Sequence, residues 1–461
     1  MRIELCRGLR ALSHLAVFLG ATPQDVAVDT VSGIATDSGE VMAGDLFVAL
    51  RGARTSGVAH VAEALSKGAA AVLVSQGEML PQKCPTLRTD DAKSALLRAA
   101  ARYRRRLRGQ LIAVSGSAGK TTVKEATAVL LSQKGSVAHS QGNFNSDIGL
   151  SLSLLSFEPC DFWVVEIGVS HPGEMAPMAH AAAPDLAVLT NVGSAHIGNY
   201  GSYEALLAEK AELLAHLRPK GRALIPADLP RSAFSCRDGA LYRFGQDGDF
   251  HLEGITMGQK GTRGDLMAPY RVITNLNWPR AGKSGISVLE TVGAIGILCG
   301  LEEDQIRRGL ALAGESTPRM RELYVGGRLL IDDGYNASPE AMLEALRVLR
   351  IRAGGRPTVA VLGDMLELGA LSEAMHAAVG RYAAEQRIDR LLAYGSRAAT
   401  LARAAREAGM PADRVLHFDE DEGPHLLEAL CDSLPKDAVV LFKASGKMNM
   451  KALVEEAVKR I

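Results

Sequence analysis

The stretch LIAVSGSAGKTTVKEA, residues 111–126, decides the fold of the middle of this chain. Its apolar start, residues 111–114, predicts a buried strand, and the residues from Lys120 onward predict a helix with one apolar face. The glycine-rich turn between them cannot continue the strand. Backbone N–H groups of such a turn and the positive end of the helix dipole converge on an anion. The stretch therefore predicts a phosphate-binding loop, in preference to a glycine turn before an ordinary helix.

The residues of this loop predict how a nucleotide is held. Lys120 is expected to reach the β- and γ-phosphates, and the Thr121 hydroxyl is expected to bind Mg²⁺. The loop is shorter than the common P-loop, because Val114 stands where that loop has its first glycine. The predicted nucleotide-binding residues of the loop are Gly116, Ser117, Ala118, Gly119, Lys120, Thr121 and Thr122.

Composition excludes several classes of protein. A chain of 461 residues is too long for one core, so several domains are expected. Basic and acidic residues both number 52, which gives no reason to expect nucleic acid as a partner. The six cysteines are scattered without a CxxC pair, which favours a reducing, cytoplasmic setting over zinc or disulfides. No apolar run approaches the roughly 20 residues that span a bilayer, so membrane insertion is not expected.

Alternating strand and helix patterns divide the chain into three α/β units, at residues 1–107, 108–315 and 316–461. Near-continuous apolar runs in the second and third units suit parallel strands that are buried on both faces. The predicted fold class is α/β, with a central P-loop parallel-sheet domain and a C-terminal Rossmann-like domain. An arginine-rich run at residues 102–108 is interpreted as the solvated face of a helix, not as a nucleic-acid site.

Polar residues close two strands of the central unit. Glu166 ends one apolar run, Asn191 ends another, and His196 follows in the next loop. Ligands of open parallel sheets lie beyond such strand ends. We therefore predict that Thr121, Glu166 and His196 hold metal beside a triphosphate. The alternatives are a capping role for Glu166 and a plain loop position for His196.

Lys210 stands on the apolar stripe of a predicted helix over residues 202–217, with leucines at positions 207, 214 and 217 on the same face. Burial of an ammonium is costly and lowers its pKa. A neutral amine can react with CO₂ to form a carbamate, whose oxygens suit Mg²⁺. From periodicity alone, a lysine that snorkels its ammonium to solvent at the edge of the stripe is the stronger interpretation.

The third unit offers a second polar strand end. The segment LLIDDGYNASPEAM, residues 329–342, predicts a strand that ends on two aspartates and a helix capped by Ser338. Asp333, Tyr335 and Asn336 are expected to face the nucleotide across a cleft between domains. Arg319, at the join of the second and third units, suits the charge of a γ-phosphate.

Together these segments resemble the Mur ligase family over nearly the whole chain. The DxYNASP and GNFNSDIG segments are specific, and they distinguish one branch from the ligases that add earlier residues. The matching segments are TDSGEVMAGDLFVALRG (36–52), GSAGKTTVKE (116–125), GNFNSDIG (142–149), EIGVSHPGEM (166–175), TNVGSAHIGNYGS (190–202), Lys210, DDGYNASPEAM (332–342) and VLGDMLELG (361–369).

The resemblance implies domains for a UDP-linked substrate, for ATP and for an amino acid or dipeptide. It implies an ATP-dependent amide ligase of peptidoglycan precursor synthesis. The γ-phosphate would pass to the carboxylate of a UDP-MurNAc-tripeptide, and the amine of D-alanyl-D-alanine would attack the acyl phosphate. It also implies two Mg²⁺ ions, an N6-carboxylated Lys210 as a further metal ligand, and a monomer whose partners are small molecules.

The resemblance also assigns roles to residues. The implied catalytic residues are Lys120, Glu166, His196 and Lys210. Beyond the loop, the implied nucleotide contacts are Asn191, Arg319, Asp333 and Asn336. The implied contacts with the other substrates are Ser38, Asn143, Asn145, Ser170 and Tyr335.

Several positions depart from the pattern of the family, and they keep other interpretations open. Two more Mur-type reactions compete, addition to another UDP-MurNAc-peptide or to folate, and a P-loop kinase is the rival from another class. The departures are Gly39 for an arginine, Ser56 for an aspartate, Ser284 and Val288 for a histidine and an asparagine, and Ala444 and Lys447 in a KGSR-like segment.

Overall fold

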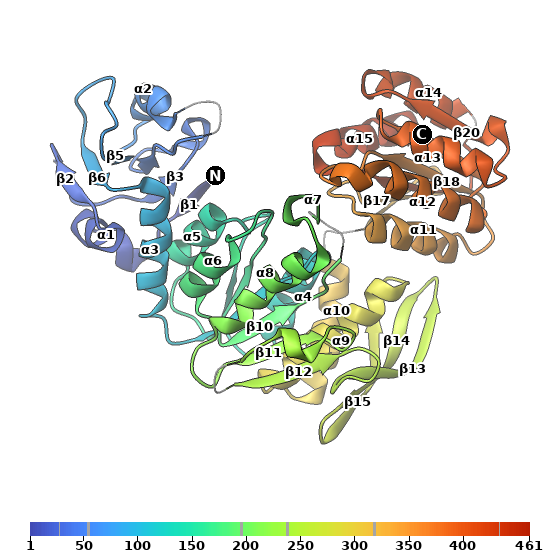
Figure 1. Cartoon of the computed structure of the whole chain (residues 1–461), viewed down its shortest axis with the longest axis horizontal. Helices are drawn as coiled ribbons and strands as arrows, with labels where there is room; N and C mark the ends of the chain where they lie inside the picture. The colour runs from blue at the N-terminus through green and yellow to red at the C-terminus, as the bar shows by residue number, and fades with distance from the viewer. Residues whose placement is uncertain (27, 53–55, 194–196, 237–238, 317–319, 433) are drawn as a thin grey trace.

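The computed structural model describes residues 1–26, 28–52, 56–193, 197–236, 239–316, 320–432 and 434–461. These residues form four β-sheets (Figure 1). The blue N-terminal part and the red C-terminal part lie on opposite sides of the green and yellow central part. Among the described helices, none has both the length and the apolarity that a bilayer crossing requires. The domain limits given above stay predictions.

The N-terminal sheet has the strand order β1-β3-β4-β5-β6-β2, with parallel strands in the middle and an antiparallel strand at each edge. Its strands are β1 (Arg2–Glu4), β2 (Thr22–Gln24), β3 (Gly33–Ala35), β4 (Leu46–Val48), β5 (Ala71–Ser75) and β6 (Thr86–Thr89). The helices that pack on it are α1 (Leu12–Leu19), α2 (Val61–Ser66) and α3 (Ala92–Arg104).

The central sheet is parallel throughout, in the order β12-β11-β10-β7-β9-β8. Its inner strands are apolar runs buried on both faces, as the sequence predicted. The strands are β7 (Gln110–Ser115), β8 (Val137–His139), β9 (Phe162–Glu166), β10 (Leu186–Leu189), β11 (Arg222–Pro226) and β12 (Ala240–Phe244). The helices of this region are α4 (Lys120–Leu131), α5 (Asp147–Ser156), α6 (Met175–Ala182), α7 (Ile197–Tyr200), α8 (Tyr203–Ala215), α9 (Lys283–Leu298) and α10 (Glu303–Ser316).

A three-stranded antiparallel sheet follows the central sheet, and the sequence analysis did not predict it. Its strands are β13 (His251–Gly258), β14 (Gly261–Ala268) and β15 (Arg271–Trp278). Its buried face, with Leu266, Ile273 and Trp278, joins the core that also contains α4, α9 and α10. The sheet therefore extends the central domain beside the helix of the phosphate loop.

The C-terminal sheet has the order β16-β17-β21-β18-β19-β20 and is parallel except for β16, which pairs antiparallel with β17. This arrangement confirms the predicted Rossmann-like domain. The strands are β16 (Arg321–Val325), β17 (Arg328–Asp332), β18 (Thr358–Gly363), β19 (Arg390–Tyr394), β20 (Val415–Phe418) and β21 (Val439–Lys443). The helices are α11 (Pro339–Ala353), α12 (Ser372–Glu385), α13 (Ala398–Glu407), α14 (Gly423–Asp432) and α15 (Met450–Arg460).

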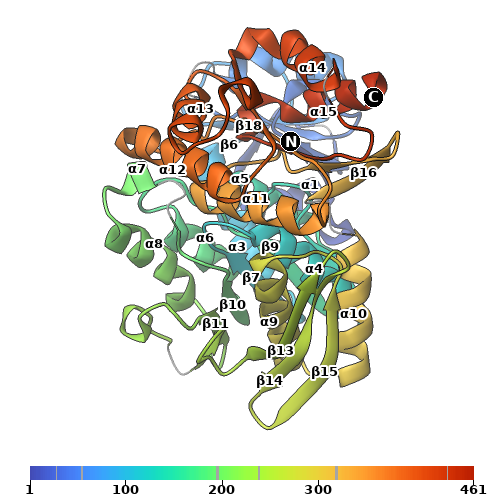
Figure 2. The same ribbon diagram turned by 90° about the vertical axis from the view of Figure 1, so that its right-hand side faces the viewer.

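Short 3₁₀ turns interrupt the loops of all three regions. They are η1 (Arg7–Leu9), η2 (Ser38–Glu40), η3 (Gly57–His60), η4 (Arg231–Ala233), η5 (Gly369–Leu371), η6 (Ala412–Arg414), η7 (Glu420–Glu422) and η8 (Gly446–Met448). Figure 2 shows α11 on the side of the C-terminal domain that faces the central domain.

The interpretation of residues 102–108 as a solvated face is wrong for Arg104. This side chain is only 1% exposed. It donates to the Ala182 carbonyl at 2.9 Å and to Asp185 Oδ2 at 2.6 Å. The reason is that α3 packs on the central domain, where the guanidinium donates to a carbonyl at the C-terminal end of α6 that has no partner within the helix. Arg104 thereby fastens the N-terminal domain to the central one.

Candidate active site

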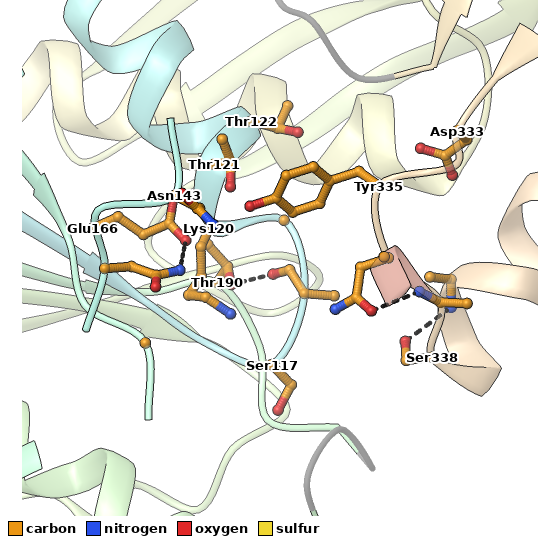
Figure 3. A pocket seen from close by; sticks show the side chains of 18 of the residues that line it. Ser117, Lys120, Thr121, Thr122, Asn143, Glu166, Thr190, Asp333, Tyr335 and Ser338 are labelled. Carbon is orange, nitrogen blue, oxygen red and sulfur yellow. Dashed lines mark hydrogen bonds between the residues drawn. The ribbon is translucent and has the colours of Figure 1, made fainter. Parts of the chain in front are cut away.

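A cleft of about 1500 Å³ separates the phosphate loop from the C-terminal domain (Figure 3). Both domains contribute to its walls, as the sequence predicted for a nucleotide held between two strand ends. The predicted site residues that line it are Ser117, Ala118, Gly119, Lys120, Thr121, Thr122, Asn143, Asn145, Glu166, Ser170, Asn191, Asp333, Tyr335 and Asn336.

The phosphate loop joins β7 to α4 in the predicted way. Gly116 has φ +142°, and a side chain there would collide with the Thr190 hydroxyl, so only glycine fits. Gly119 has φ +78° and starts the helix, with its carbonyl accepting from the Val123 N–H at 2.9 Å. The N-terminus of α4 therefore opens into the cleft, where it favours an anion. Lys120 Nζ donates to the Gly116 carbonyl at 2.8 Å.

Asn191 organises the loop from the end of β10. Its Oδ1 accepts from the Ser117 N–H at 3.1 Å and from the Ala118 N–H at 2.8 Å, and its Nδ2 donates to the Ala118 carbonyl at 3.1 Å. Two loop amides that the sequence assigned to phosphate thus bind a side chain. The positive character that remains at the loop comes from Lys120 and the helix terminus.

Glu166 is a buried carboxylate of the central wall. Its side chain is 2% exposed, and its Oε1 accepts from Asn145 Nδ2 at 2.8 Å. Its Oε2 is buried and has no hydrogen-bond partner in the part of the chain that the structure describes. A buried carboxylate oxygen without a partner is costly unless a cation is bound to it. Glu166 therefore has the chemistry of a metal ligand.

Lys210 lies on the buried face of α8 and is 2% exposed, so its ammonium does not reach solvent. Burial and the nearby positive charge of Lys120 lower the pKa of Lys210 to about 7, against a small opposite effect of Glu209. The snorkelling interpretation is therefore wrong. Lys210 does not line the cleft itself, but its interaction with Lys120 places it behind the phosphate loop.

A second buried lysine, Lys124, was missed by the sequence analysis. It lies on α4 and is fully buried. Its Nζ donates to the Ser140 carbonyl at 2.6 Å and to the Gly142 carbonyl at 3.2 Å, and it pairs with Glu125 at 2.8 Å. Lys124 thereby ties the helix of the phosphate loop to the segment that carries Asn143 and Asn145 into the cleft.

The C-terminal wall begins where β17 ends. Ser338 caps α11, as predicted, by accepting from the Ala341 N–H at 3.4 Å. In Figure 3 the Tyr335 ring points from this wall toward Thr121 and Lys120. The segment is held from behind by a residue that the sequence analysis did not assign a role.

This residue is Lys443, at the end of β21. It is 3% exposed, and its Nζ pairs with Asp333 Oδ2 at 2.5 Å and donates to the Asn336 carbonyl at 2.9 Å. Asp333 therefore already has a cation, and its position in the cleft depends on Lys443. The signal was present in the sequence as a lysine at a strand end, but its partner is 110 residues away.

The two walls touch along α11. Glu344 Oε1 accepts from the Ser284 N–H at 3.2 Å, so a carboxylate of the C-terminal domain lies at the N-terminus of α9. Gly282, with φ +107°, leaves room for this carboxylate. Further along α11, Arg352 donates to the Gln259 carbonyl in the turn between β13 and β14.

Some predicted residues are elsewhere or are not described. His196 and Arg319 lie outside the described residues. Ser38 is in the N-terminal domain, where its hydroxyl donates to Glu63 Oε2 at 2.7 Å, and it does not line the cleft. Among the described histidines, cysteines and acidic residues, no three come together in a metal-binding group.

The chain matches three family descriptions in sequence. Residues 30–106 match the "Mur ligase family, catalytic domain", residues 114–292 the "Mur ligase middle domain", and residues 319–446 the "Mur ligase, glutamate ligase domain". A UDP-N-acetylmuramoyl-tripeptide–D-alanyl-D-alanine ligase of Bacillus subtilis is 31% identical over 433 residues, which are 93% of each chain. The chain belongs to the Mur ligase family.

Further relatives support the assignment of this chain to the Mur ligase family. The ligase of the same name from Escherichia coli is 33% identical over 404 residues, covering 86% of this chain and 88% of the relative. A crystal structure of MurF from Acinetobacter baumannii superposes with a TM-score of 0.85 at 26% identity, over 99% of both chains. The crystal structure of MurF from Thermotoga maritima in complex with ADP superposes with a TM-score of 0.80 at 27% identity, over 93% of this chain and 97% of that one.

Proposed function

We propose that this Mur ligase joins D-alanyl-D-alanine to a UDP-MurNAc-tripeptide at the expense of ATP. The observation that carries the proposal is full-length similarity to ligases of that name together with a phosphate loop that opens into the cleft between two domains. The kinase alternative does not explain the matching C-terminal domain. The protein acts as a cytoplasmic monomer on small molecules.

The reaction has two steps. The carboxylate of the tripeptide attacks the γ-phosphorus of ATP, the bond to the β–γ bridging oxygen breaks, and ADP leaves an acyl phosphate behind. The amine of the dipeptide then attacks the acyl carbon, phosphate leaves, and the amine loses a proton. Lys120 and the N-terminus of α4 hold the phosphates in both steps. Charge that develops on the phosphoryl oxygens is stabilised by such fixed donors.

Asn191, Asp333, Asn336 and Arg319 form the rest of the nucleotide site in this proposal. Asn191 acts by fixing the conformation of the loop. Asp333 and Asn336 act from the opposite wall, where Lys443 holds them in position. Asn143, Asn145, Ser170 and Tyr335 contact the acyl substrate and the dipeptide, while Ser38 contacts the UDP-linked end from the N-terminal domain.

The residues present fit a divalent cation. Glu166 Oε2 is buried without a hydrogen-bond partner among the described residues, and Thr121 lies on the same wall of the cleft. Thr121, Glu166, His196 and a carboxylated Lys210 would hold two Mg²⁺ ions, which would neutralise charge on the phosphoryl oxygens.

The proposed carboxylation of Lys210 follows from its surroundings. A buried amine with a pKa of about 7 is neutral in half of the molecules at that pH, and only the neutral amine is a nucleophile. Its nitrogen forms a bond to the carbon of CO₂, one C=O π bond opens onto oxygen, and the amine proton is released to solvent. The product is an anion, which turns a repulsive charge behind the phosphate loop into an attractive one.

Two departures from the family pattern, Gly39 and Ser56, lie in the N-terminal domain and do not line the cleft, and the others fall into two groups. Ser284, Val288 and Lys447 line the cleft, so they can alter the contacts of a ligand. Ala444 does not line it, because this side chain is buried against Gly363. The first group is a reason to keep a second candidate function, in which the amine that enters the cleft is an amino acid.

The decisive experiment measures phosphate release from ATP with UDP-MurNAc-tripeptide and one amine at a time. We expect release with D-alanyl-D-alanine, and none when either the carboxylate or the amine is omitted. Meso-diaminopimelate, lysine and glutamate are the comparison amines, and preference for one of them would establish the second candidate. Formation of ADP without any amine and without release of phosphate would favour a kinase-like reaction instead.

A further inference from the structure

A buried histidine, His376 on α12, lies directly behind the C-terminal wall of the cleft. Its side chain is fully buried. Its Nδ1 approaches the Ser372 carbonyl at 2.7 Å, and its Nε2 approaches the Met365 N–H at 3.0 Å. A carbonyl can only accept and an N–H can only donate. The ring must therefore carry its proton on Nδ1 and use Nε2 as an acceptor, which only the neutral imidazole can do.

The backbone that His376 holds is the turn after β18, residues 364–368. Ser445 holds the same turn from the other side, with its N–H on the Asp364 carbonyl at 3.0 Å and its hydroxyl accepting from the Leu366 N–H at 2.9 Å. His376 and Ser445 thus clamp three successive residues. Leu366 and Leu368 line the cleft, and so does Glu367 between them.

Glu367 has φ +66°, a left-handed conformation that is unfavourable for a residue with a side chain. Such strain persists only where the surrounding contacts fix the backbone, and it concentrates at functional sites. The turn then leads into η5, whose Gly369 backbone lies against Gly198 of α7 in the central domain. The clamp therefore fixes both a wall of the cleft and a contact between the two domains.

We propose that His376 is a positioning residue for the ligase reaction: as a neutral acceptor it holds the 364–368 turn in the strained conformation that lines the nucleotide cleft. The kinetic part of this proposal rests on the proposed function. The structural part, that the imidazole acceptor holds the turn, does not.

The charged groups that face His376 are Asp364 and Arg397. Burial is the main influence and lowers the pKa of His376. The hydrogen bond to the Ser372 carbonyl and the Asp364 carboxylate raise this pKa, and Arg397 lowers it. Because the pKa in the folded state is depressed, the clamp is complete above the usual pKa of histidine and is lost as the pH falls through the depressed value. Protonation would place an Nε2–H against the Met365 N–H.

Three variants test the proposal. His376→Leu removes the acceptor, and His376→Gln places an amide oxygen near the position of Nε2. His425→Leu, an exposed histidine on α14 of the same domain, is the control. We expect His376→Leu to lower kcat/KM for ATP by about 10- to 100-fold at a temperature where the protein is folded, because small displacements of positioning groups have effects of this size. His376→Gln should stay within about threefold of the wild type, and His425→Leu should match it.

Hydrogen exchange of the peptide that contains residues 364–371 gives a readout without any substrate. Exchange should be faster in His376→Leu than in the wild type and near normal in His376→Gln. Normal exchange and normal kinetics in His376→Leu would overturn the proposal, and so would a His376→Gln variant as defective as His376→Leu. A wild type without ligase activity but with the expected exchange pattern would refute the proposed function and keep the clamp.

The pH dependence covers the case in which His376→Leu does not fold. The wild type should lose protection of the 364–371 peptide on the acid side of neutrality. His376→Gln has no imidazole to protonate and should keep this protection to lower pH. Identical loss of protection with falling pH in the wild type and His376→Gln would show that the imidazole does not control this turn.

Discussion

Two lysines of the central domain, Lys124 and Lys210, are both buried on helices beside the phosphate loop, yet their surroundings differ. Lys124 has two carbonyls and a carboxylate within 3.2 Å of its ammonium. None of the hydrogen bonds and ion pairs among the described residues involves the ammonium of Lys210, and burial lowers its pKa to about 7. Burial alone therefore does not decide the role of a lysine. The partners decide whether it stays a structural cation or becomes a reactive amine.

The largest expected effect comes from Lys210→Arg. Arginine keeps a positive charge and cannot form a carbamate, so we expect kcat to fall by roughly 10³-fold, since the metal ion that the carbamate would help to hold supplies several kcal/mol of charge stabilisation. Steady-state phosphate release measures the loss. Acetate at high concentration should restore part of the activity of Lys210→Ala by occupying the place of the carbamate. If Lys210→Arg were about as active as the wild type, Lys210 would not be a reactive amine and would have a structural role like that of Lys124.

Lys120→Ala, at the loop itself, should lower kcat by roughly 10²-fold, because one contact with the charge of the transition state is lost. The half-buried side chain has little part in the core, so the unfolding midpoint should hardly change. Lys436→Ala, an exposed lysine of the C-terminal domain, is the matched control and should behave like the wild type. Normal turnover by Lys120→Ala would disprove the assignment of the phosphate loop.

The free energy of unfolding should distinguish the roles of Lys124 and Lys210 without any assay of activity. Lys124→Met leaves the buried Ser140 carbonyl and the Gly142 carbonyl without their donor, and we expect the free energy of unfolding to fall by about 1–3 kcal/mol. Lys210→Met removes an amine that has no such partner among the described residues, so unfolding in urea should show no comparable loss. Equal losses in the two variants would mean that Lys210 also serves the fold.

The smallest expected effect is a dependence on pH and CO₂. With a pKa of about 7, the neutral fraction of Lys210 falls by about fivefold between pH 7 and pH 6. The rate at which added CO₂ restores activity to a CO₂-depleted enzyme should fall by the same factor, because only the neutral amine attacks CO₂. The sign follows because protonation blocks the nitrogen lone pair. A rate of reactivation that does not change with pH would argue against carboxylation of this amine.

The sequence predicted the central wall of the cleft better than the C-terminal wall. A short contiguous segment contains the strand, the glycine turn and the start of the helix, so local rules were sufficient for the phosphate loop. The buried face of α8 could likewise be predicted from periodicity, although only the structure showed that Lys210 reaches no solvent.

Lys124, Lys443 and His376 escaped prediction because their roles depend on partners that the fold brings together. The partner of Lys443 is Asp333, 110 residues earlier, and the partners of Lys124 are carbonyls, which have no signature in sequence. The same reason explains the error at Arg104. The arginine-rich run around it predicted a side chain exposed to solvent, but its helix packs on another domain. The antiparallel sheet of β13–β15 was missed because no motif marked it.

The amide of Asn191 has a consequence for how fast and how tightly a nucleotide can bind. By holding the Ser117 and Ala118 N–H groups, it orders the loop through contacts within the protein itself. A loop that is already ordered loses little conformational entropy when a triphosphate arrives, so association resembles the docking of two rigid bodies. An inhibitor built to capture the Ser117 and Ala118 amides would have to displace Asn191, whereas one that reaches Lys120 and the first turn of α4 would not.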